Sequence, residues 1–411
     1  MMHRCGETGV QTHIRDALGY LDDRHCPPQF VGPEATLKPR RALYSLTRLL
    51  SGGLPTANPL RRYLIDRVFA LTLRSELERR LRGQIAWTVY AQDPLCASVA
   101  LGLRDRPAQR VVLAVHFNVS QADEMAVRGI VKIGDWLYRR TQRQEREALC
   151  RADGVVFFSR FMEEQIRLRG IMVRSSIVIP HTAAPVETDR QAEPGDLIAV
   201  GTLEPRKNQA YLLLVLHEAA LRGHRYRLTI VGSGEDRQSL ERLAVRLGVQ
   251  GQVVFLGMRP AAASLLAMHK VFVHAARMEA FGIALVEALA AGLPVLAPRV
   301  GGIPEIVRDG IEGYFWPLDD PAEGARLLMR LMEDPLLRQR MARAASRRLH
   351  DRFDRNTIGG RLAAYVRTDS RAGQLQATER GAMSEDLVAG GNHDRRRIAA
   401  VVHYSTLKLG P

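Results

Sequence analysis

Short apolar runs alternate along most of the chain with segments of helical periodicity. This alternation is typical of parallel sheets covered by helices on both faces, because each strand is then buried on both sides. In the first half it predicts helices over 10–21 and 162–169, and strands over 85–91, 111–117 and 154–158. In the second half it predicts strands over 197–201, 226–231, 253–256, 271–274 and 295–297. We therefore expect an α/β protein with two sheet-based halves.

A polar stretch separates the two halves. The apolar run 177–181 is followed by Pro185 and polar residues up to Gly195, a composition typical of an interdomain linker. We place the boundary near residue 184, which gives domains over 1–184 and 185–366. Residues 368–392 are rich in Ser, Gly, Gln and charge, so we expect a flexible tail over 367–411. Within it, the run 398–404 would make one strand, for which the pattern offers no partner.

The net charge of +15 favours polyanionic ligands. Nucleic acid, acidic lipid headgroups and phosphorylated small molecules would all suit this field. Nucleic acid is not expected, because no DNA- or RNA-binding signature accompanies the charge. Residues 61–82 carry arginines beside a stripe of leucines, so this segment is either a core-facing helix or a helix in peripheral contact with an anionic membrane.

Cysteine usage and hydropathy favour a cytoplasmic protein. The four cysteines lie far apart and form no Cys-x-x-Cys pair, so neither a zinc site nor a disulfide framework is expected. The longest apolar stretch, 283–298, carries a glutamate and is broken by Gly292 and Pro294, which makes it unsuited to span a bilayer. The first residues lack the apolar core of a signal peptide. Peripheral association with the inner membrane face stays open.

The main candidate site joins a predicted strand to a helix. Gly282 lets the backbone approach a ligand, and the amides of Ile283 and Ala284 fall at a helix N-terminus, a natural site for a diphosphate. Glu279 precedes this turn, whereas Glu287 lies about two turns into the helix. We expect these two carboxylates to contact opposite ends of one elongated ligand. The alternative is a solvated pair that only favours the helix start.

Two cations follow the first strand of the second half. Arg206 and Lys207 come after a proline-bearing turn, so they can project from the carboxyl edge of the sheet, where open α/β folds bind ligands. A surface charge cluster is the alternative. Gly232 and Gly234 either contact the ligand or only permit a tight turn. No Asp-x-Asp signature follows a strand, so neither a metal nor another cofactor is expected.

Several motifs in the second half carry a family resemblance. Glu279 and Glu287 enclose seven residues, and they accompany Gly201-Thr-Leu-Glu-Pro-Arg-Lys-Asn, Val231-Gly-Ser-Gly and Val300-Gly-Gly-Ile-Pro-Glu. The order and spacing of these motifs along the chain make residues 195–350 resemble family four of the retaining glycosyltransferases. The resemblance implies a GT-B architecture, in which two Rossmann-like domains face each other across a cleft. It assigns the acceptor to the N-terminal domain and a nucleotide-diphosphate sugar to the C-terminal one.

The resemblance also implies roles for single residues. Glu279 would contact the donor sugar, Glu287 would hold the ribose hydroxyls, and Lys207 would neutralise the diphosphate. Family members often have Gly-Arg where this chain has Gly201-Thr, which leaves Arg206 to supply the missing phosphate contact. The amides that follow Phe281 would meet the charge that grows on the leaving group.

The N-terminal half resembles the family more loosely. Gly9 and the residues after it resemble the glycine loop and first helix that follow the family's opening strand, yet the eight residues before Gly9 do not predict a strand. Either the given start of the chain is wrong or the N-terminal domain lacks this strand. Gln92 stands where many relatives carry a histidine that faces the donor sugar, and it can hydrogen-bond but not exchange a proton. His116 ends a predicted strand, so it is either catalytic or a structural strand-end histidine.

Taken together, these features predict a retaining, metal-independent glycosyltransferase. It would move a sugar from a nucleotide-diphosphate donor to the hydroxyl of a glycan or lipid-linked acceptor, in polysaccharide or glycolipid assembly. Two alternatives remain at this point. A non-catalytic scaffold would bind the nucleotide sugar without releasing nucleotide, and a nucleotide-sugar epimerase would convert the donor without any acceptor.

Overall fold

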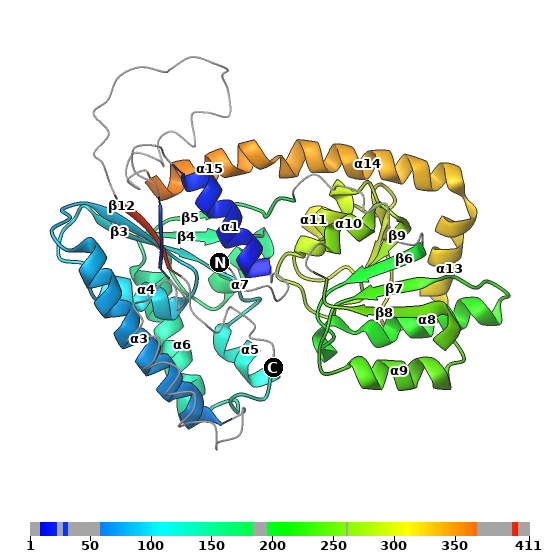
Figure 1. Cartoon of the computed structure of the whole chain (residues 1–411), viewed down its shortest axis with the longest axis horizontal. Coiled ribbons are helices and arrows are strands. Elements are labelled where there is room, and N and C mark those ends of the chain that lie inside the picture. The colour runs from blue at the N-terminus through cyan, green and yellow to red at the C-terminus, as the bar shows by residue number, and fades with distance from the viewer. Residues whose placement is uncertain are drawn as a thin grey trace, which may run out of the picture. The chain divides into compact units, whose positions relative to one another are not determined.

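The computed structural model of the chain describes residues 9–22, 28–31, 58–183, 195–259, 262–367 and 397–401 (Figure 1). Its contacts divide the described residues into two compact units. The C-terminal unit comprises Pro180–Ile358, and the N-terminal unit comprises the described parts of Thr8–Ile179 and Gly359–Leu409. Each unit is built on one six-stranded parallel sheet, which confirms the expected α/β class with two Rossmann-like domains.

The sheet of the C-terminal unit has the strand order of dinucleotide-binding folds. Its strands are β6 (Gly195–Val200), β7 (Leu228–Val231), β8 (Val253–Gly257), β9 (His269–Val273), β10 (Val295–Ala297) and β11 (Gly313–Phe315). They lie in the order β11-β10-β9-β6-β7-β8. The order reverses between β6 and β9, so the loops that follow these two strands diverge. Ligands of open parallel sheets bind at this switch point.

Helices cover this sheet and bury its core. They are α8 (Gln209–Leu221), α9 (Arg237–Arg246), α10 (Ala262–Leu266), α11 (Ile283–Ala290), α12 (Ile303–Ile306), α13 (Pro321–Glu333) and α14 (Pro335–Phe353). Sequence signals fix where two of them begin. Asp320 and Asp334 each accept a bond from the amide three residues on, and each is followed by proline at the first helical position. Tyr211 on α8 packs edge-on against Trp316.

The N-terminal unit has the other parallel sheet. Its strands are β1 (Gln29–Val31), β2 (Trp87–Ala91), β3 (Gln109–Ala114), β4 (Gly154–Phe157), β5 (Ser176–Val178) and β12 (Arg397–Val401). Its helices are α1 (Gly9–Leu21), α3 (Pro59–Leu81), α4 (Pro94–Leu101), α5 (Gln121–Val127), α6 (Trp136–Arg151) and α7 (Arg160–Leu168). The strands and helices predicted for both halves are confirmed, with ends that shift by at most three residues. None of the helices in the described part of the chain is long and apolar enough to cross a membrane.

After residue 358 the chain belongs to the N-terminal unit again. The sequence led us to expect that the C-terminal domain would extend to residue 366. Helix α15 (Arg355–Arg367) crosses from one contact unit to the other at residue 358. Its last turns are tied to the N-terminal unit, since Tyr365 hydrogen-bonds Ser175 at 3.0 Å and Arg367 donates to the Leu21 carbonyl at 2.9 Å. The amphipathic pattern of this helix does not reveal which sheet it packs on.

Residues 397–401 also differ from the expectation. The sequence assigned them to a flexible tail with no strand partner, but they form β12, which pairs in parallel with both β1 and β2. They thereby occupy the interior of the sheet that was expected to lack a strand. An apolar run predicts a buried strand, but strand neighbours distant in sequence leave no local signal. The expected linker before Gly195 and the rest of the expected tail lie outside the described residues.

The core of the C-terminal unit predicts a clear contrast between two leucines of α8. Leu213 is fully buried, whereas Leu221 at the end of the same helix is exposed. Leu213→Ala leaves a cavity and is expected to lower the free energy of unfolding by about 2–5 kcal/mol. Leu221→Ala should change it by no more than about 0.5 kcal/mol. Urea unfolding followed by circular dichroism measures both, and equal effects would place Leu213 outside the core.

Candidate active site

A buried charge cluster lies at the switch point of the C-terminal sheet. Lys207 ends the short 3-10 helix Pro205–Lys207 after β6, whereas His274 and Glu279 follow β9. The Lys207 ammonium donates a hydrogen bond to Glu279 Oε2, and His274 Nε2 lies 3.3 Å from the same oxygen. The two expected site residues therefore meet, although 72 positions separate them in the chain.

This cluster keeps Glu279 ionised. Burial alone would raise the pKa of Glu279, but the charge of Lys207, the hydrogen bond with His274 and the charge of Arg206 together hold it well below its usual range. Burial lowers the pKa of His274 despite its carboxylate neighbour. At neutral pH the site thus contains a fixed carboxylate beside a neutral imidazole. Such a carboxylate can accept hydrogen bonds from hydroxyls but cannot serve as a proton donor.

Arg206 connects the two loops of the switch point. Its guanidinium donates to the Met278 carbonyl at 3.0 Å and to Glu204 Oε1 at 2.6 Å. Its own carbonyl accepts from the amide of Arg277 at 2.9 Å. The side chain that was expected to contact phosphate therefore also fastens the loop carrying Glu279 to the loop carrying Lys207. A phosphate contact by Arg206 stays a prediction.

A left-handed residue places Lys207. Asn208, which follows it, has φ 53° and ψ 41° and is the one non-glycine residue with positive φ in the described ranges. Asparagine tolerates this conformation better than most residues. The chain thereby turns sharply out of the 3-10 helix and into α8. Asn208 lies in the motif that follows the first strand of the second half, but its role was not evident from the sequence.

The glycines after β6 and β7 let two loops touch backbone to backbone. A Cβ on Gly232 would lie 1.8 Å from the Gly201 carbonyl oxygen, and one on Gly234 would lie 2.0 Å from that of Leu203. Gly201 and Gly232 also have φ of 157° and 145°. These contacts give all three expected site glycines a structural role. Direct contact between these glycines and a donor stays a prediction.

The turn before α11 is built as expected. Gly282 has φ 106° and ψ 69° and starts the helix without any side-chain cap. The first amides of a helix have no intrahelical acceptor, so those of Ile283 and Ala284 are suited to an anion. Glu287 is half-buried on the same helix. Phe281 is buried against the rings of His181 and Phe353, so its side chain belongs to the core.

Two further glycines hold the backbone of Glu279. The Gly302 amide donates to the Glu279 carbonyl at 3.0 Å, and a Cβ on Gly301 would lie 1.9 Å from that oxygen. Gly301 has φ 54°, where other residues are strained. The motif at residues 300–305 therefore holds the backbone of Glu279 and so helps to position its carboxylate. The roles of these glycines and of His274 were not evident from the sequence, although His274 is the last residue of the strand predicted over 271–274.

The N-terminal unit brings together its own two candidates. Gln92 follows β2 and His116 lies just beyond β3, and His116 Nε2 is 2.9 Å from Gln92 Oε1. His13 of α1 packs edge-on against His116 and hydrogen-bonds the Tyr90 hydroxyl at 2.9 Å. Burial, and then the neighbouring His13, keep the pKa of His116 well below its usual range. Burial lowers the pKa of His13 to about 3. Both imidazoles are therefore neutral at physiological pH.

Gly9 begins α1, in agreement with the glycine start expected for this helix. A contact between Gly9 and a donor stays a prediction.

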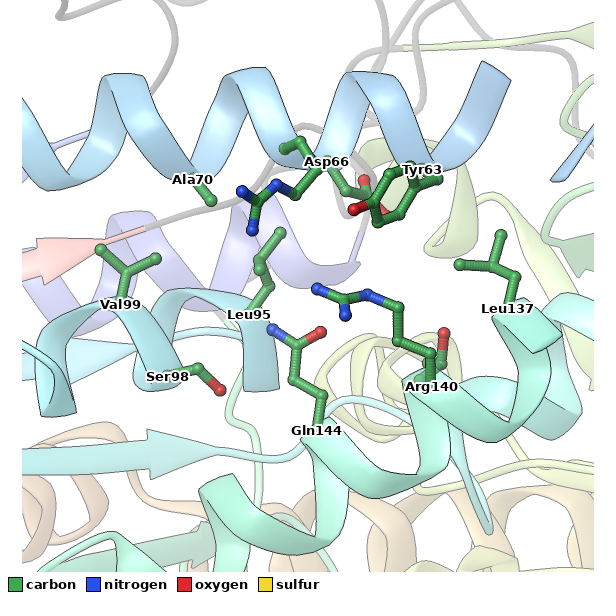
Figure 2. Close-up of a pocket in the computed structure, with 11 residues that line it drawn as sticks. Tyr63, Asp66, Ala70, Leu95, Ser98, Val99, Leu137, Arg140 and Gln144 are labelled. Atoms are coloured by element: carbon green, nitrogen blue, oxygen red, sulfur yellow. The ribbon is translucent and has the colours of Figure 1, made fainter. Parts of the chain in front are cut away.

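One cavity lies away from these groups, among α3, α4 and α6 (Figure 2). Tyr63 and Asp66 reach it from α3, Ser98 from α4, and Arg140 and Gln144 from α6. It contains none of the site residues expected from the sequence. No group of three or more His, Cys, Asp or Glu side chains suited to a metal occurs within the ranges that the structure covers.

The chain matches two families of glycosyltransferases. The family described as glycosyl transferases group 1 matches residues 183–348, and glycosyltransferase family 4 matches residues 8–183. The two parallel sheets with their helices share the fold of solved GT-B glycosyltransferases. The chain belongs to these group 1, family four glycosyltransferases.

Individual relatives match over part of their length. A phosphatidyl-myo-inositol mannosyltransferase of Mycolicibacterium smegmatis is 33% identical over 190 residues, which cover 46% of this chain and 48% of the relative. An N-acetyl-alpha-D-glucosaminyl L-malate synthase of Bacillus anthracis is 33% identical over 127 residues, covering 31% and 33%. The matches thus span half or less of these relatives. The crystal structure of Anabaena HepE in complex with UDP-glucose shares the fold, with TM-score 0.60 and 22% identity over 72% of this chain and 82% of that one.

The low pKa of Glu279 predicts a pH-dependent stability difference. A carboxylate whose pKa is lowered by folding stabilises the protein above its unfolded pKa, and this contribution fades as the pH falls toward the folded value. Wild type should therefore exceed Glu279→Gln in unfolding free energy at neutral pH, and the gap should narrow below the usual pKa near 4.5. Urea unfolding from neutral pH down to about pH 3 measures it.

Glu241→Gln is the matched control, because this carboxylate forms an exposed ion pair with Arg237. Its effect should be small at every pH. A gap for Glu279→Gln that stays constant across the range would contradict the assigned charge state.

Proposed function

We propose that this chain is a retaining, metal-independent glycosyltransferase. It moves a sugar from a nucleotide-diphosphate donor to an acceptor hydroxyl of a glycan or lipid-linked molecule, in polysaccharide or glycolipid assembly. The observation that carries the proposal is the meeting of Lys207 and Glu279 at the switch point, beside the open N-terminus of α11. Family membership supports it, and so does the relative that is named as a mannosyltransferase.

The donor diphosphate binds between Lys207 and the first amides of α11. Breaking the bond between the anomeric carbon and the phosphate oxygen leaves negative charge on the diphosphate. Lys207 and the amides of Ile283 and Ala284 offset this charge with groups that need little reorganisation. The acceptor oxygen forms its bond on the face that the phosphate leaves, and its proton departs with the nucleotide phosphate. The ionised Glu279 accepts hydrogen bonds from the donor sugar, and Glu287 from the ribose.

The N-terminal unit supplies neutral groups to the sugar and acceptor. His116 is fixed by Gln92 and stays uncharged, so it acts as a hydrogen-bond partner for a hydroxyl. Gln92 adds an amide but no proton exchange. Charge stabilisation is thus assigned to the C-terminal unit, and orientation of hydroxyls to the N-terminal one.

Two other functions make different predictions. A scaffold would bind a nucleotide sugar without ever releasing free nucleotide, whatever acceptor is supplied. An epimerase would convert the sugar of the donor in the absence of an acceptor. Incubation with a panel of nucleotide sugars and crude glycan or lipid acceptors, followed by chromatography of nucleotides and sugars, separates the three outcomes. Conversion without an acceptor would rule out the transferase.

Removal of the Lys207 charge is expected to impair turnover. Lys207→Met should lower the rate of transfer about a hundredfold or more, because one of the groups facing the leaving diphosphate is lost. It should also weaken UDP binding in calorimetry. Lys270→Met is the matched control, since Lys270 is an exposed lysine on β9 that pairs with Asp196. Full transfer by Lys207→Met, or equal losses in both variants, would overturn the site.

We also propose that α3 makes peripheral contact with an anionic membrane at the cytoplasmic face. Leu60, Leu64 and Leu71 are 51%, 42% and 62% exposed, and their spacing places them on one face of this helix. Arg67 is exposed on the same face, while the helix buries Leu73 and Leu77 against the core. Figure 1 shows α3 on the outside of its unit. Exposed leucines beside arginines suit the boundary between lipid headgroups and acyl chains.

This contact is tested by sedimentation with vesicles. Leu64→Glu should reduce binding to vesicles rich in phosphatidylglycerol severalfold, because it places a negative charge on the exposed face of α3 that is proposed to enter the membrane. Leu221→Glu, which alters an exposed leucine of the other unit, should leave binding unchanged. Equal binding to neutral and anionic vesicles, or no effect of Leu64→Glu, would refute the proposed contact.

A further inference from the structure

Strand β12 lies inside the N-terminal sheet and not at its edge. It pairs in parallel with β2 over five residues, from Arg397 opposite Trp87 to Val401 opposite Ala91. On its other side it pairs with β1, where Gln29, Phe30 and Val31 lie opposite residues 399–401. Figure 1 shows it in red among the strands of that sheet. The last strand of the described chain is therefore enclosed by strands from its first hundred residues.

The composition of β12 suits this interior position. After Arg397 it reads Ile-Ala-Ala-Val, without the charges or prolines that protect an edge strand. Ile398 is 4% exposed and Ala399 2%. Of the described strands, β12 is the only one that pairs with β1. Without β12, β1 and one side of β2 would lose their strand partner, and buried backbone groups need such partners.

The topology indicates which strand β12 replaces. The sheet order is β1-β12-β2-β3-β4-β5. If β12 is counted as strand 1 and β1 to β5 as strands 2 to 6, the order becomes 2-1-3-4-5-6. Its first five positions are the 2-1-3-4-5 order of doubly wound folds. In such folds the first strand leads into the first helix, and here α1 packs against β12. In this chain α1 precedes all described strands, whereas β12, the strand that it packs against, follows α15.

We propose that residues 397–401 are a built-in strand donor, which completes the N-terminal sheet of the same chain. The slot between β1 and β2 is an interaction surface for one parallel strand, and its occupant is this C-terminal segment. Because β12 pairs with all of β2, whose end carries Gln92, docking of the segment also positions the Gln92 and His116 pair.

Reach and attachment favour the chain's own segment over that of a second copy. The 29 residues between Arg367 and Arg397 could extend over about 100 Å. The end of α15 from which they start is bonded to the same unit through Tyr365 and Arg367. A strand tethered in this way has a high effective concentration at its slot.

Hydrogen exchange of the full chain tests the strand donor. Ala399→Asp places a charge in the buried strand and should abolish the protection of peptides covering β1 and β2. Peptides covering β6 and β9 should keep their protection, because they belong to the other unit. Ala364→Asp is the control, since Ala364 is exposed on α15, and it should change neither set. Unchanged protection of β2 in Ala399→Asp would overturn the proposal.

A second measurement applies even if Ala399→Asp fails to fold. A protease site placed between residues 368 and 396 allows the wild-type sequence to be cut after folding. The fragment with β12 should remain bound through size-exclusion chromatography, and light scattering should give the mass of a monomer before cutting. Release of the fragment would refute docking, and a stable dimer would refute donation within one chain. The proposal does not rest on the proposed function, since UDP binding by the other unit is expected to survive the cut.

Discussion

The ion pair between Lys207 and Glu279 is the interaction on which the candidate site depends. It joins the two loops that diverge at the switch point of the C-terminal sheet, and the remaining features of the site serve to bring these two groups together. Asn208 turns the chain behind Lys207, and Gly301 with Gly302 hold the backbone of Glu279. The adjacent amides of α11 add partial positive charge. A phosphate group arriving there meets donors that are already oriented.

The two units offer different chemistry. The C-terminal unit gathers an ionised carboxylate and cations, whereas the N-terminal unit gathers imidazoles that burial keeps neutral. This division fits a reaction in which charge develops on the leaving diphosphate while the sugar and acceptor hydroxyls need orientation.

The sequence predicted the strands and the motifs well, because both depend on local patterns. The strand over 295–297 and the glycine turn before α11 are where the pattern placed them. Contacts between distant segments were not predictable. Hydropathy alone could not show that Lys207 bonds Glu279, that Gly232 packs on Gly201, or that β12 fits between β1 and β2. Burial was equally hidden, so the neutral state of His116 required the structure.

The most direct test of the donor site is a crystal structure of the protein with UDP bound. We expect the diphosphate to lie within hydrogen-bonding distance of Lys207 Nζ and of the Ile283 and Ala284 amides, with the ribose hydroxyls at Glu287. Lys207 would then be shared between the phosphate and Glu279. Well-defined UDP elsewhere on the protein, with the Lys207 and Glu279 pair untouched, would contradict the proposed donor site.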